Sequence, residues 1–445
     1  MPRVVIVGGG ITGLSAAYYL DRLSDFEVTL LEGSDRLGGK VQTERDGELV
    51  VEVGPDSIFT RKPWAMNLIS DLEIGCKLVE PMQREFSMLI HGRLRTVPSG
   101  LASLTSVDAS SVSRAAFLSE TAKHRVLEEW KIPKGPGGDE SVASFFRRRF
   151  GDEFSRLVAE PLLAGTHAGD PDKLSMAALY PTYLAAEQKY GNLSGLPEGS
   201  SPVTVPRQAT FVSLTGGMQT LVDEIVKKLQ NTQLRTQATV EKIEFGSVTL
   251  AAGEVIEADH ILVTVPSFVA ADLLGNDALR KIRHASSAIV TLGYDSATFP
   301  KLEGTGFLVP QSESSGITGC TWTSSKWPGR APDNTVLLRV FMGSDGGLNV
   351  EELYDGELID LATKSIAQIL DLEHPPVYEK LQRWHRGLPQ YELGHLDLLK
   401  KIEDELIQTP GIYLAGASYR GVGIPDCIKQ GREAAVAIAV EIDEH

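Results

Sequence analysis

The sequence predicts a multidomain α/β protein in which one domain is assembled from segments far apart in the chain. A strand–helix–strand pattern occupies residues 3–31, and alternating strands and helices return from residue 215. The chain then ends with a strand, a glycine loop and a helix. Between these parts, residues 100–160 have helical spacing of apolar residues and no strand pattern, which indicates a helical insertion. A length of 445 residues favours about three folding units.

Composition and charge exclude several classes of protein. The chain is 42% hydrophobic and 23% charged, which is typical of globular proteins. Its net charge of −16 argues against binding to nucleic acid, which needs a basic surface. Three widely spaced cysteines, without a CxxC pair, indicate reduced thiols and give no metal-ligand spacing. No apolar run approaches the length of a membrane span and no signal-peptide pattern is visible, so we expect a cytoplasmic protein.

The first strand, residues 3–7, is a short apolar run typical of a buried strand. A helix is expected over residues 14–23 and a second strand over residues 27–31. The turn between the first strand and the helix is rich in glycine and consists of Gly8, Gly9, Gly10, Ile11, Thr12 and Gly13.

This turn matches the GxGxxG pattern of dinucleotide-binding folds. Gly8 permits the tight turn, Gly10 lets a pyrophosphate approach the backbone, and Gly13 lets helix and strand pack closely. The phosphates then lie on the free N–H groups of a helix N-terminus. Glu32 follows Gly13 by 19 residues, where a carboxylate accepts hydrogen bonds from ribose hydroxyls and repels a 2′-phosphate. We therefore predict a Rossmann-like nucleotide-binding domain.

Later elements follow from the same periodicities. Within the helical region, Ser141 is expected to cap a helix that runs to residue 150. The α/β part contains a helix at 218–229, a hairpin at 239–245 and 248–251, a buried strand at 261–265, a strand at 412–415 and a helix from about 425. Alternating segments that predict an antiparallel sheet occur at 287–294, 305–309, 317–323 and 335–342.

Beyond Glu32, the segment from Arg36 through Gly38, Gly39 and Lys40 resembles the FAD-containing amine oxidase superfamily. In that superfamily an RxGG stretch follows the acidic residue and lines the pyrophosphate. The resemblance implies FAD as the cofactor. The chain has no second GxGxxG motif for a nicotinamide cofactor, so we expect reduced flavin to pass its electrons to dioxygen or another external acceptor.

Further stretches resemble one branch, the protoporphyrinogen and coproporphyrinogen oxidases of haem synthesis. In chain order they are residues 52–57, 145–153, 168–175, 215–221, 389–395 and 419–426. Residues 320–323 and 326–328 are most similar to the Gram-positive type, which acts on coproporphyrinogen III.

The resemblance implies an FAD domain of the p-hydroxybenzoate-hydroxylase type, a substrate domain with a mixed sheet, and a helical domain. On the sequence we assign residues 1–60, 205–280 and 376–445 to the FAD domain, 61–80 and 281–375 to the substrate domain, and 81–204 to the helical domain.

The resemblance also implies residue roles around the cofactor. Residues 54–57 would pass beside the flavin, Val240 would contact the adenine through its backbone, and residues 422–424 would reach the flavin ring. Trp384 would lie near the cofactor. With the glycine turn and Glu32, the implied FAD-binding residues are Gly33, Arg36, Gly38, Gly39, Lys40, Gly54, Pro55, Asp56, Ser57, Val240, Trp384, Val422, Gly423 and Ile424.

The implied reaction removes a hydride from a bridging methylene carbon of a porphyrinogen to flavin N5, while a pyrrole N–H loses its proton. Three such cycles give the porphyrin, with dioxygen reduced to hydrogen peroxide each time. No catalytic side chain is assigned, because the cofactor carries the chemistry. Coproporphyrinogen has four propionates, which an acidic protein must meet with local basic groups. Candidate substrate residues are Lys62, which we favour, Arg61, Arg207, Lys326 and Tyr391.

Two residues depart from the family pattern: Thr166 and His167 stand where an apolar residue and a tyrosine are expected. They are further candidates for contact with the substrate. Alternatives to coproporphyrinogen oxidation are protoporphyrinogen IX oxidation, an amine oxidase, a flavin-bearing porphyrin carrier, and a non-redox mutase acting on a nucleotide sugar. The resemblance is compatible with transfer of the product to a ferrochelatase and with peripheral contact at the inner face of the cell membrane.

Overall fold

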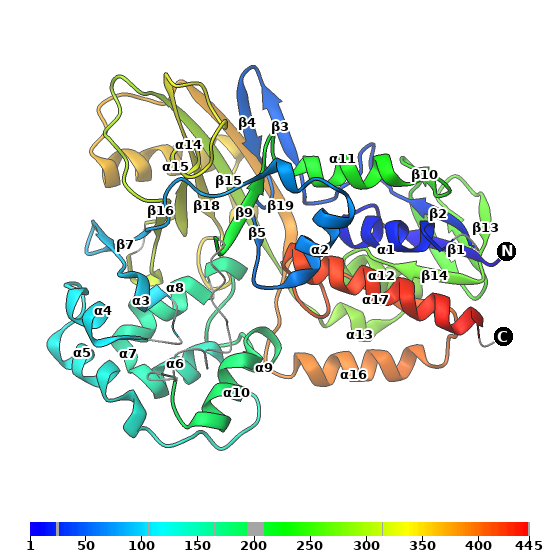
Figure 1. The fold of residues 1–445 in the computed structure, drawn as a ribbon, viewed down its shortest axis with the longest axis horizontal. Coiled ribbons are helices and arrows are strands. Elements are labelled where there is room, and N and C mark those ends of the chain that lie inside the picture. Colours follow the sequence, from blue (N-terminus) through cyan, green and yellow to red (C-terminus); the bar gives the residue numbers. More distant parts are fainter. Residues whose placement is uncertain are drawn as a thin grey trace.

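The computed structural model describes residues 1–23, 26–102, 104, 107–163, 165–193, 209–313 and 315–443. It confirms the α/β class. Figure 1 shows a parallel-sheet region, which carries both chain termini, at one end of the molecule. A large sheet and a group of short helices lie at the other end. No helix within the described residues is both long enough and apolar enough to span a membrane.

The parallel sheet has five strands in the order β10-β2-β1-β14-β20. All its pairings are parallel, and its strands come from three distant parts of the chain. The apolar runs that predicted strands at both ends of the chain therefore belong to one sheet, with β14 between β1 and β20. The strands are β1 (Arg3–Val7), β2 (Glu27–Leu31), β10 (Gln233–Arg235), β14 (His260–Val263) and β20 (Ile412–Leu414).

Helices α1 (Ile11–Asp21) and α17 (Ile424–Asp443) pack closely beside this sheet (Figure 1). Nearly every residue of α1 is buried, because α1 lies between the sheet and α17. A Cβ atom on Gly431 would lie 2.4 Å from the carbonyl oxygen of Thr12, so only glycine permits this approach. The N-cap of α1 is Gly10, which offers no side chain to the first N–H groups of the helix.

The second sheet has seven strands in the order β19-β15-β18-β17-β16-β7-β8. It is mixed, as predicted, because β16 and β7 are parallel while the other pairs are antiparallel. The strands are β7 (Ser87–Ile90), β8 (Arg93–Thr96), β15 (His284–Asp295), β16 (Gly306–Leu308), β17 (Gly319–Trp322), β18 (Thr335–Met342) and β19 (Tyr378–Pro389).

Three strands of this sheet lie outside residues 281–375, where the sequence placed its antiparallel segments. Strands β7 and β8 come from the stretch assigned to the helical domain, and β19 comes from the stretch assigned to the FAD domain. The sequence pattern did not reveal β19 because this edge strand is mostly half-buried and carries several charged residues. The exact domain boundaries stay a prediction.

The described residues between β8 and residue 193, upstream of β9 (Phe211–Leu214), form helices and no named strand, as the sequence predicted. The Ser141 hydroxyl caps α6 by accepting a hydrogen bond from the Ser144 N–H at 3.1 Å. Phenylalanines of α6 and of the turn after it fill the core of this region. Its α-helices are α3 (Ser99–Ala102), α4 (Ala109–Arg114), α5 (Glu120–Leu127), α6 (Val142–Phe150), α7 (Asp152–Phe154), α8 (Glu160–Leu163), α9 (Met176–Leu179) and α10 (Pro181–Tyr190).

The predicted hairpin is confirmed as β11 (Val240–Glu244) and β12 (Ser247–Leu250), extended by β13 (Val255–Glu257). The short strands β3 (Thr43–Asp46) and β4 (Leu49–Glu52) form a further hairpin, and β5 (Ile58–Phe59) and β6 (Leu78–Val79) pair with β9. The other α-helices are α2 (Pro63–Asp71), α11 (Gln219–Lys228), α12 (Ser267–Leu274), α13 (Asp277–Arg280), α14 (Thr323–Lys326), α15 (Asp355–Leu370) and α16 (His395–Leu406).

Candidate active site

The glycine turn between β1 and α1 has the geometry that its sequence predicts. Gly8 has a φ of +112°, and a Cβ atom on it would lie 2.8 Å from Thr264 Oγ1. A Cβ atom on Gly13 would lie 2.1 Å from the Gly8 carbonyl oxygen, so helix and strand touch here. At Gly10, by contrast, a Cβ atom would meet nothing within 4 Å. The turn therefore leaves space in front of the uncapped N-terminus of α1, which suits an anionic group.

A second glycine stretch lies directly beside this turn. The Gly38 N–H donates to the Gly9 carbonyl at 2.8 Å, and a Cβ atom on Gly39 would lie 3.1 Å from Gly10 Cα. Arg36 fixes the stretch by donating to the Gly39 carbonyl at 2.7 Å and to the Val41 carbonyl at 3.0 Å. Burial lowers the pKa of Arg36. The two motifs quoted separately from the sequence thus form one continuous surface.

Glu32 lies at the end of β2, beside the glycine turn. Its carboxylate accepts hydrogen bonds from the Gly9 N–H and the Ser34 N–H, both at 2.8 Å. The segment that leads into β11 runs alongside, because the Ala238 N–H donates to the Glu32 carbonyl at 2.9 Å. The structure therefore brings Glu32, Gly33 and the start of β11, where Val240 lies, to one place.

The segment Gly54–Ser57 crosses behind Lys40. A Cβ atom on Gly54 would lie 1.8 Å from the Lys40 carbonyl oxygen, so no side chain fits there. Asp56, which is largely buried, accepts hydrogen bonds from Lys326 Nζ at 3.0 Å and Trp327 Nε1 at 2.9 Å. Burial alone would raise the pKa of Asp56, but the charges of Lys326 and Arg339 outweigh it and hold this pKa well below its usual range.

The loop before α17 is held by a buried tyrosine. The Tyr391 hydroxyl donates to the Ala417 carbonyl at 2.6 Å and accepts from the Gly421 N–H at 2.8 Å. Its ring stacks on His395 with 4.0 Å between ring centroids. Because Tyr391 is only 1% exposed, the structure places it against this loop, which leads into Val422–Ile424, and gives it no exposed surface for a substrate.

Trp384 of β19 contacts the residue that precedes Gly54. Its indole N–H donates to the Val53 carbonyl at 2.7 Å.

Lys40 is half-buried, and burial lowers its pKa. Its ammonium has no hydrogen-bond or ion-pair partner among the described residues. No sequence pattern singles out His284. Burial lowers the pKa of His284 to about 4, and the charge of the nearby Lys40 contributes less. No spacing in the sequence connects His284 with Lys40.

The four basic candidates for substrate binding have different surroundings. Lys62 forms an ion pair with Asp426 of α17 at 2.7 Å, and Lys326 binds Asp56. Arg61 is half-buried, and its Nε has no hydrogen-bond partner within the described residues. Burial lowers the pKa of Arg61. The fourth candidate, Arg207, lies outside the described residues.

Thr166 and His167 lie in a short 3₁₀ turn, Gly165–His167, that follows α8. Thr166 is exposed and His167 is half-buried. The charge of Lys62 contributes to the lowered pKa of His167, after the larger effect of burial.

These are the features of a dinucleotide-binding oxidoreductase: a helix N-terminus without a side-chain cap after a glycine turn, an acidic residue at the end of β2, and a second glycine stretch. The model of the family described as flavin-containing amine oxidoreductase matches residues 11–439. The chain belongs to this family, and membership confirms the predicted FAD cofactor and the oxidoreductase class. The residues fit a flavin dinucleotide, because the space at Gly10 would receive the pyrophosphate while Glu32 would receive the ribose.

Named relatives match almost the whole chain. Coproporphyrinogen III oxidase of Bacillus subtilis is 36% identical over 455 residues, which cover 97% of each chain. Protoporphyrinogen oxidase of Bos taurus is 32% identical and covers 98% of each chain. A crystal structure from Exiguobacterium sp. 255-15, named as a candidate protoporphyrinogen oxidase, superimposes with a TM-score of 0.87 at 33% identity and covers 99% of each chain.

Proposed function

We propose that the protein oxidises coproporphyrinogen III to coproporphyrin III in haem biosynthesis, with FAD as cofactor and dioxygen as the electron acceptor. The observation that carries this proposal is the similarity over 97% of the chain to the Bacillus subtilis coproporphyrinogen III oxidase. The Staphylococcus aureus protein of the same name is 29% identical and covers 99% of the chain. Protoporphyrinogen IX oxidation is the second candidate, favoured by the similarity to the Bos taurus protein.

Bound FAD would supply the two-electron oxidant for each carbon–hydrogen bond that is broken. The chain itself would bind and orient the cofactor. The free N–H groups of α1 and the adjoining Gly38–Gly39 stretch would hold the pyrophosphate, and Glu32 would accept hydrogen bonds from the ribose. Gly54–Ser57, Trp384 and Val422–Ile424 would flank the flavin ring, and Val240 would contact the adenine. Lys40, which has no charged partner among the described residues, would lie beside the cofactor.

The substrate's propionates would be met by Arg61 and Lys62. Arg61 is a half-buried cation with a spare N–H, which is a costly arrangement unless a ligand carboxylate completes it. Lys62 already forms an ion pair with Asp426, so a propionate would have to compete with the Asp426 carboxylate. Lys326 is less available, because its ammonium is committed to Asp56. We keep a cytoplasmic location and transfer of the product to a ferrochelatase as predictions.

The test is aerobic oxidation of coproporphyrinogen III and protoporphyrinogen IX side by side, followed by porphyrin fluorescence and peroxide. We expect faster formation of coproporphyrin, with hydrogen peroxide as the second product. A preference for protoporphyrinogen IX would instead select the second candidate. If neither substrate gives porphyrin although FAD is bound, the proposal is wrong, and turnover of polyamines would then indicate an amine oxidase.

The role of Glu32 can be tested without turnover. Replacing Glu32→Ala removes the carboxylate that accepts from the Gly9 N–H and would accept from the ribose. We expect loss of FAD during dialysis, with an increase in Kd of about 10-fold or more, since a charge-assisted hydrogen bond contributes about 1.5–3 kcal/mol. Glu27→Ala is the control, because Glu27 is an exposed residue at the other end of β2. Equal flavin content in both variants after dialysis would refute this role.

A further inference from the structure

The imidazole of His167 is held in one tautomer by its surroundings. Three oxygen atoms surround its Nδ1: the Leu163 carbonyl at 3.0 Å, Thr166 Oγ1 at 3.0 Å and the Tyr180 hydroxyl at 3.4 Å. The Thr166 and Tyr180 hydroxyls both donate to the Leu163 carbonyl, at 2.8 and 2.9 Å. The Leu163 carbonyl can only accept, so its 3.0 Å contact with Nδ1 is a hydrogen bond in which the nitrogen is the donor. A nitrogen in this position must carry the hydrogen itself, which leaves the lone pair on Nε2.

The same surroundings keep the ring neutral. Burial is the main cause that lowers the pKa of His167, and the ammonium of Lys62 lowers it further, while the Leu163 carbonyl raises it. The titratable groups that face the ring are Tyr180, whose own pKa burial raises, and Lys62. No carboxylate is among the groups that shift the pKa of His167. Nε2 has no hydrogen-bond partner among the described residues, so it is a neutral and unoccupied acceptor.

His167 is also near Lys62, a predicted substrate residue. Lys62, whose charge reaches the imidazole, forms its ion pair with Asp426, two residues after Ile424. The backbone around the histidine is fixed from two sides, because Gln390 Nε2 donates to the His167 carbonyl at 3.0 Å and the Asp345 N–H donates to the Ala168 carbonyl at 2.8 Å. The backbone at His167 is thus joined to the segments around Gln390 and Asp345, and Gln390 precedes Tyr391, which holds the loop predicted to face the flavin.

We propose that His167 Nε2 accepts the proton released from a pyrrole N–H as the macrocycle is oxidised. This inference rests on the proposed function. In the step, a bridging C–H bond breaks and its electron pair leaves as hydride to FAD, the oxidant of the proposed reaction. The pyrrole N–H bond breaks, its proton passes to Nε2, and its electron pair forms the new double bond of the ring system. The imidazolium then returns the proton to water.

A weak base is sufficient for this step. Loss of hydride makes the pyrrole cationic, which makes its N–H acidic, so a neutral imidazole can remove the proton. The nearby Lys62 ammonium disfavours a second positive charge on His167, which speeds the return of the proton to solvent. His167 is therefore assigned as a catalytic residue in addition to its predicted contact with the substrate.

The first test compares pH profiles of wild type and His167→Gln, each loaded with FAD. His167 must be neutral to accept a proton. The wild-type kcat should therefore decrease at acidic pH, and this decrease should begin only when the pH falls to the lowered pKa of His167. In the variant we expect this acid limb to disappear and kcat to fall about 10- to 100-fold, with KM changed less than about 3-fold. Addition of imidazole should restore part of the rate to His167→Ala. His124→Gln, an exposed histidine of α5, is the matched control.

The second test does not depend on turnover. In holoenzyme labelled with ¹⁵N-histidine, the resonances lost in His167→Gln should show a protonated Nδ1 and an unprotonated Nε2 at pH 7. An Nε2–H tautomer, or a rate and acid limb unchanged in His167→Gln, overturns the inference while leaving the proposed function intact. Failure of the wild-type enzyme to oxidise either porphyrinogen overturns both, and the two failures are therefore distinguishable.

Discussion

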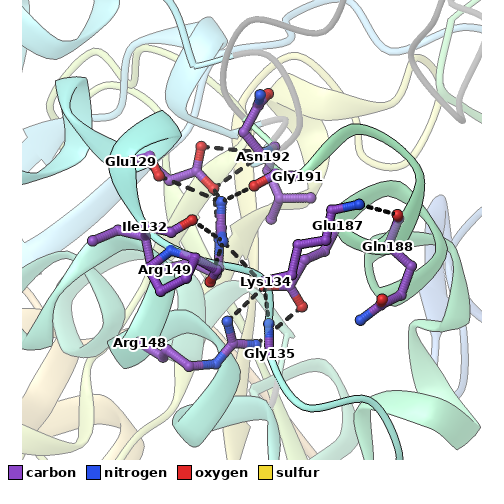
Figure 2. A network of polar contacts seen from close by, with 12 residues as sticks. Glu129, Ile132, Lys134, Gly135, Arg148, Arg149, Glu187, Gln188, Gly191 and Asn192 are labelled. Carbon is purple, nitrogen blue, oxygen red and sulfur yellow. Dashed lines mark hydrogen bonds and ion pairs between the residues drawn. The ribbon is translucent and has the colours of Figure 1, made fainter.

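Two clusters of buried ionic groups in the described part of the chain differ in how completely those groups are paired. One cluster joins α6 to α10 in the helical region and is centred on Arg149 (Figure 2). The other lies behind the Gly54–Ser57 segment and contains Glu52, Asp56, Lys326, Arg330 and Arg339. Both consist largely of side chains that are at most a few per cent exposed, so neither is a surface salt bridge of small energetic value.

In the helical cluster the central guanidinium has no spare donors. Arg149 donates from Nε to Glu129 at 2.6 Å, from NH1 to Glu187 at 3.1 Å, and from NH2 to the Gly191 carbonyl at 3.0 Å (Figure 2). Burial alone would raise the pKa of Glu187, but hydrogen bonds and charge from Arg148, with the charge of Arg149, lower it. Arg148 Nε has no hydrogen-bond partner within the described residues, but the central Arg149 is fully bonded and fixes α6, α10 and the loop before α6 against each other. We call this the closed network, because its central guanidinium is fully bonded.

In the cluster behind Gly54 the guanidinium groups keep spare donors. Arg330 Nε and NH1 and Arg339 Nε have no hydrogen-bond partner within the described residues. Two carboxylates face three cations, and burial raises the pKa of Glu52 although Arg330 opposes it. Arg339 donates to the Gly54 carbonyl, so the excess positive charge is attached directly to the segment predicted to flank the flavin. The network that is closed at its central Arg149 joins structural elements, whereas the open network, in which two arginines keep spare donors, lies beside the candidate active site.

Breaking the closed network should have the largest effect on stability. Arg149→Met would take from Glu129 the guanidinium that binds it and leave that carboxylate at 0% exposure. We expect a loss of about 3–5 kcal/mol of unfolding free energy, measured as a shift of the denaturant midpoint. The control is Arg280→Met on α13, because Arg280 is half-exposed and pairs only with the exposed Asp272 and Asp277 among the described residues. A loss of less than about 1 kcal/mol is expected there. Equal shifts in both variants would contradict a structural role for the buried network.

Charge removal from the open network should cost less stability and change the cofactor site. Asp56→Asn keeps the acceptor oxygen for Trp327 but removes the charge that balances Lys326 and Arg339. We expect a loss of about 2–3 kcal/mol at neutral pH and a lower ratio of flavin to protein after dialysis. Because the folded-state pKa of Asp56 is lowered, its stabilising contribution is present above the unfolded value of about 3.9 and decreases only as pH falls below that value.

The matched control for this substitution is Asp172→Asn, since Asp172 is also paired with an arginine but is 58% exposed. That variant should keep its flavin and lose little stability. If the difference between wild type and Asp56→Asn shrinks already near neutral pH, the lowered pKa assigned to Asp56 is wrong.

The sequence could predict the part of the site that depends on local spacing. The GxGxxG turn, Glu32 and the RxGG stretch are each defined by neighbours within a few tens of residues, and the structure brings them together. The network around Asp56 could not be predicted, because Asp56 and Lys326 are 270 positions apart and no periodicity connects them. No sequence pattern indicates that the Lys326 ammonium is bonded to Asp56, and contact of Lys326 with the substrate stays a prediction. The polar edge strand β19 was also missed, because its alternation does not separate apolar from polar positions.

The ion pair between Lys62 and Asp426 extends the comparison to a pair that is only partly buried. The Lys62 side chain is 48% exposed, so its bond to Asp426 can be exchanged for another carboxylate at small cost. We expect Lys62→Ala to change stability by less than about 1 kcal/mol and to raise KM for coproporphyrinogen III about 3- to 10-fold. The increase should be smaller for protoporphyrinogen IX, which has fewer propionates.

Lys77→Ala is the control for Lys62→Ala, because Lys77 forms a comparable ion pair with Glu224 of α11. The Lys77 side chain is 38% exposed. Its KM values should stay those of the wild type. Equal increases in KM for both porphyrinogens in Lys62→Ala would show that the lysine does not distinguish them by their carboxylates. In that case the ion pair with Asp426 would act only by holding α2 to the start of α17, and Arg61 would be the remaining described cation for the propionates.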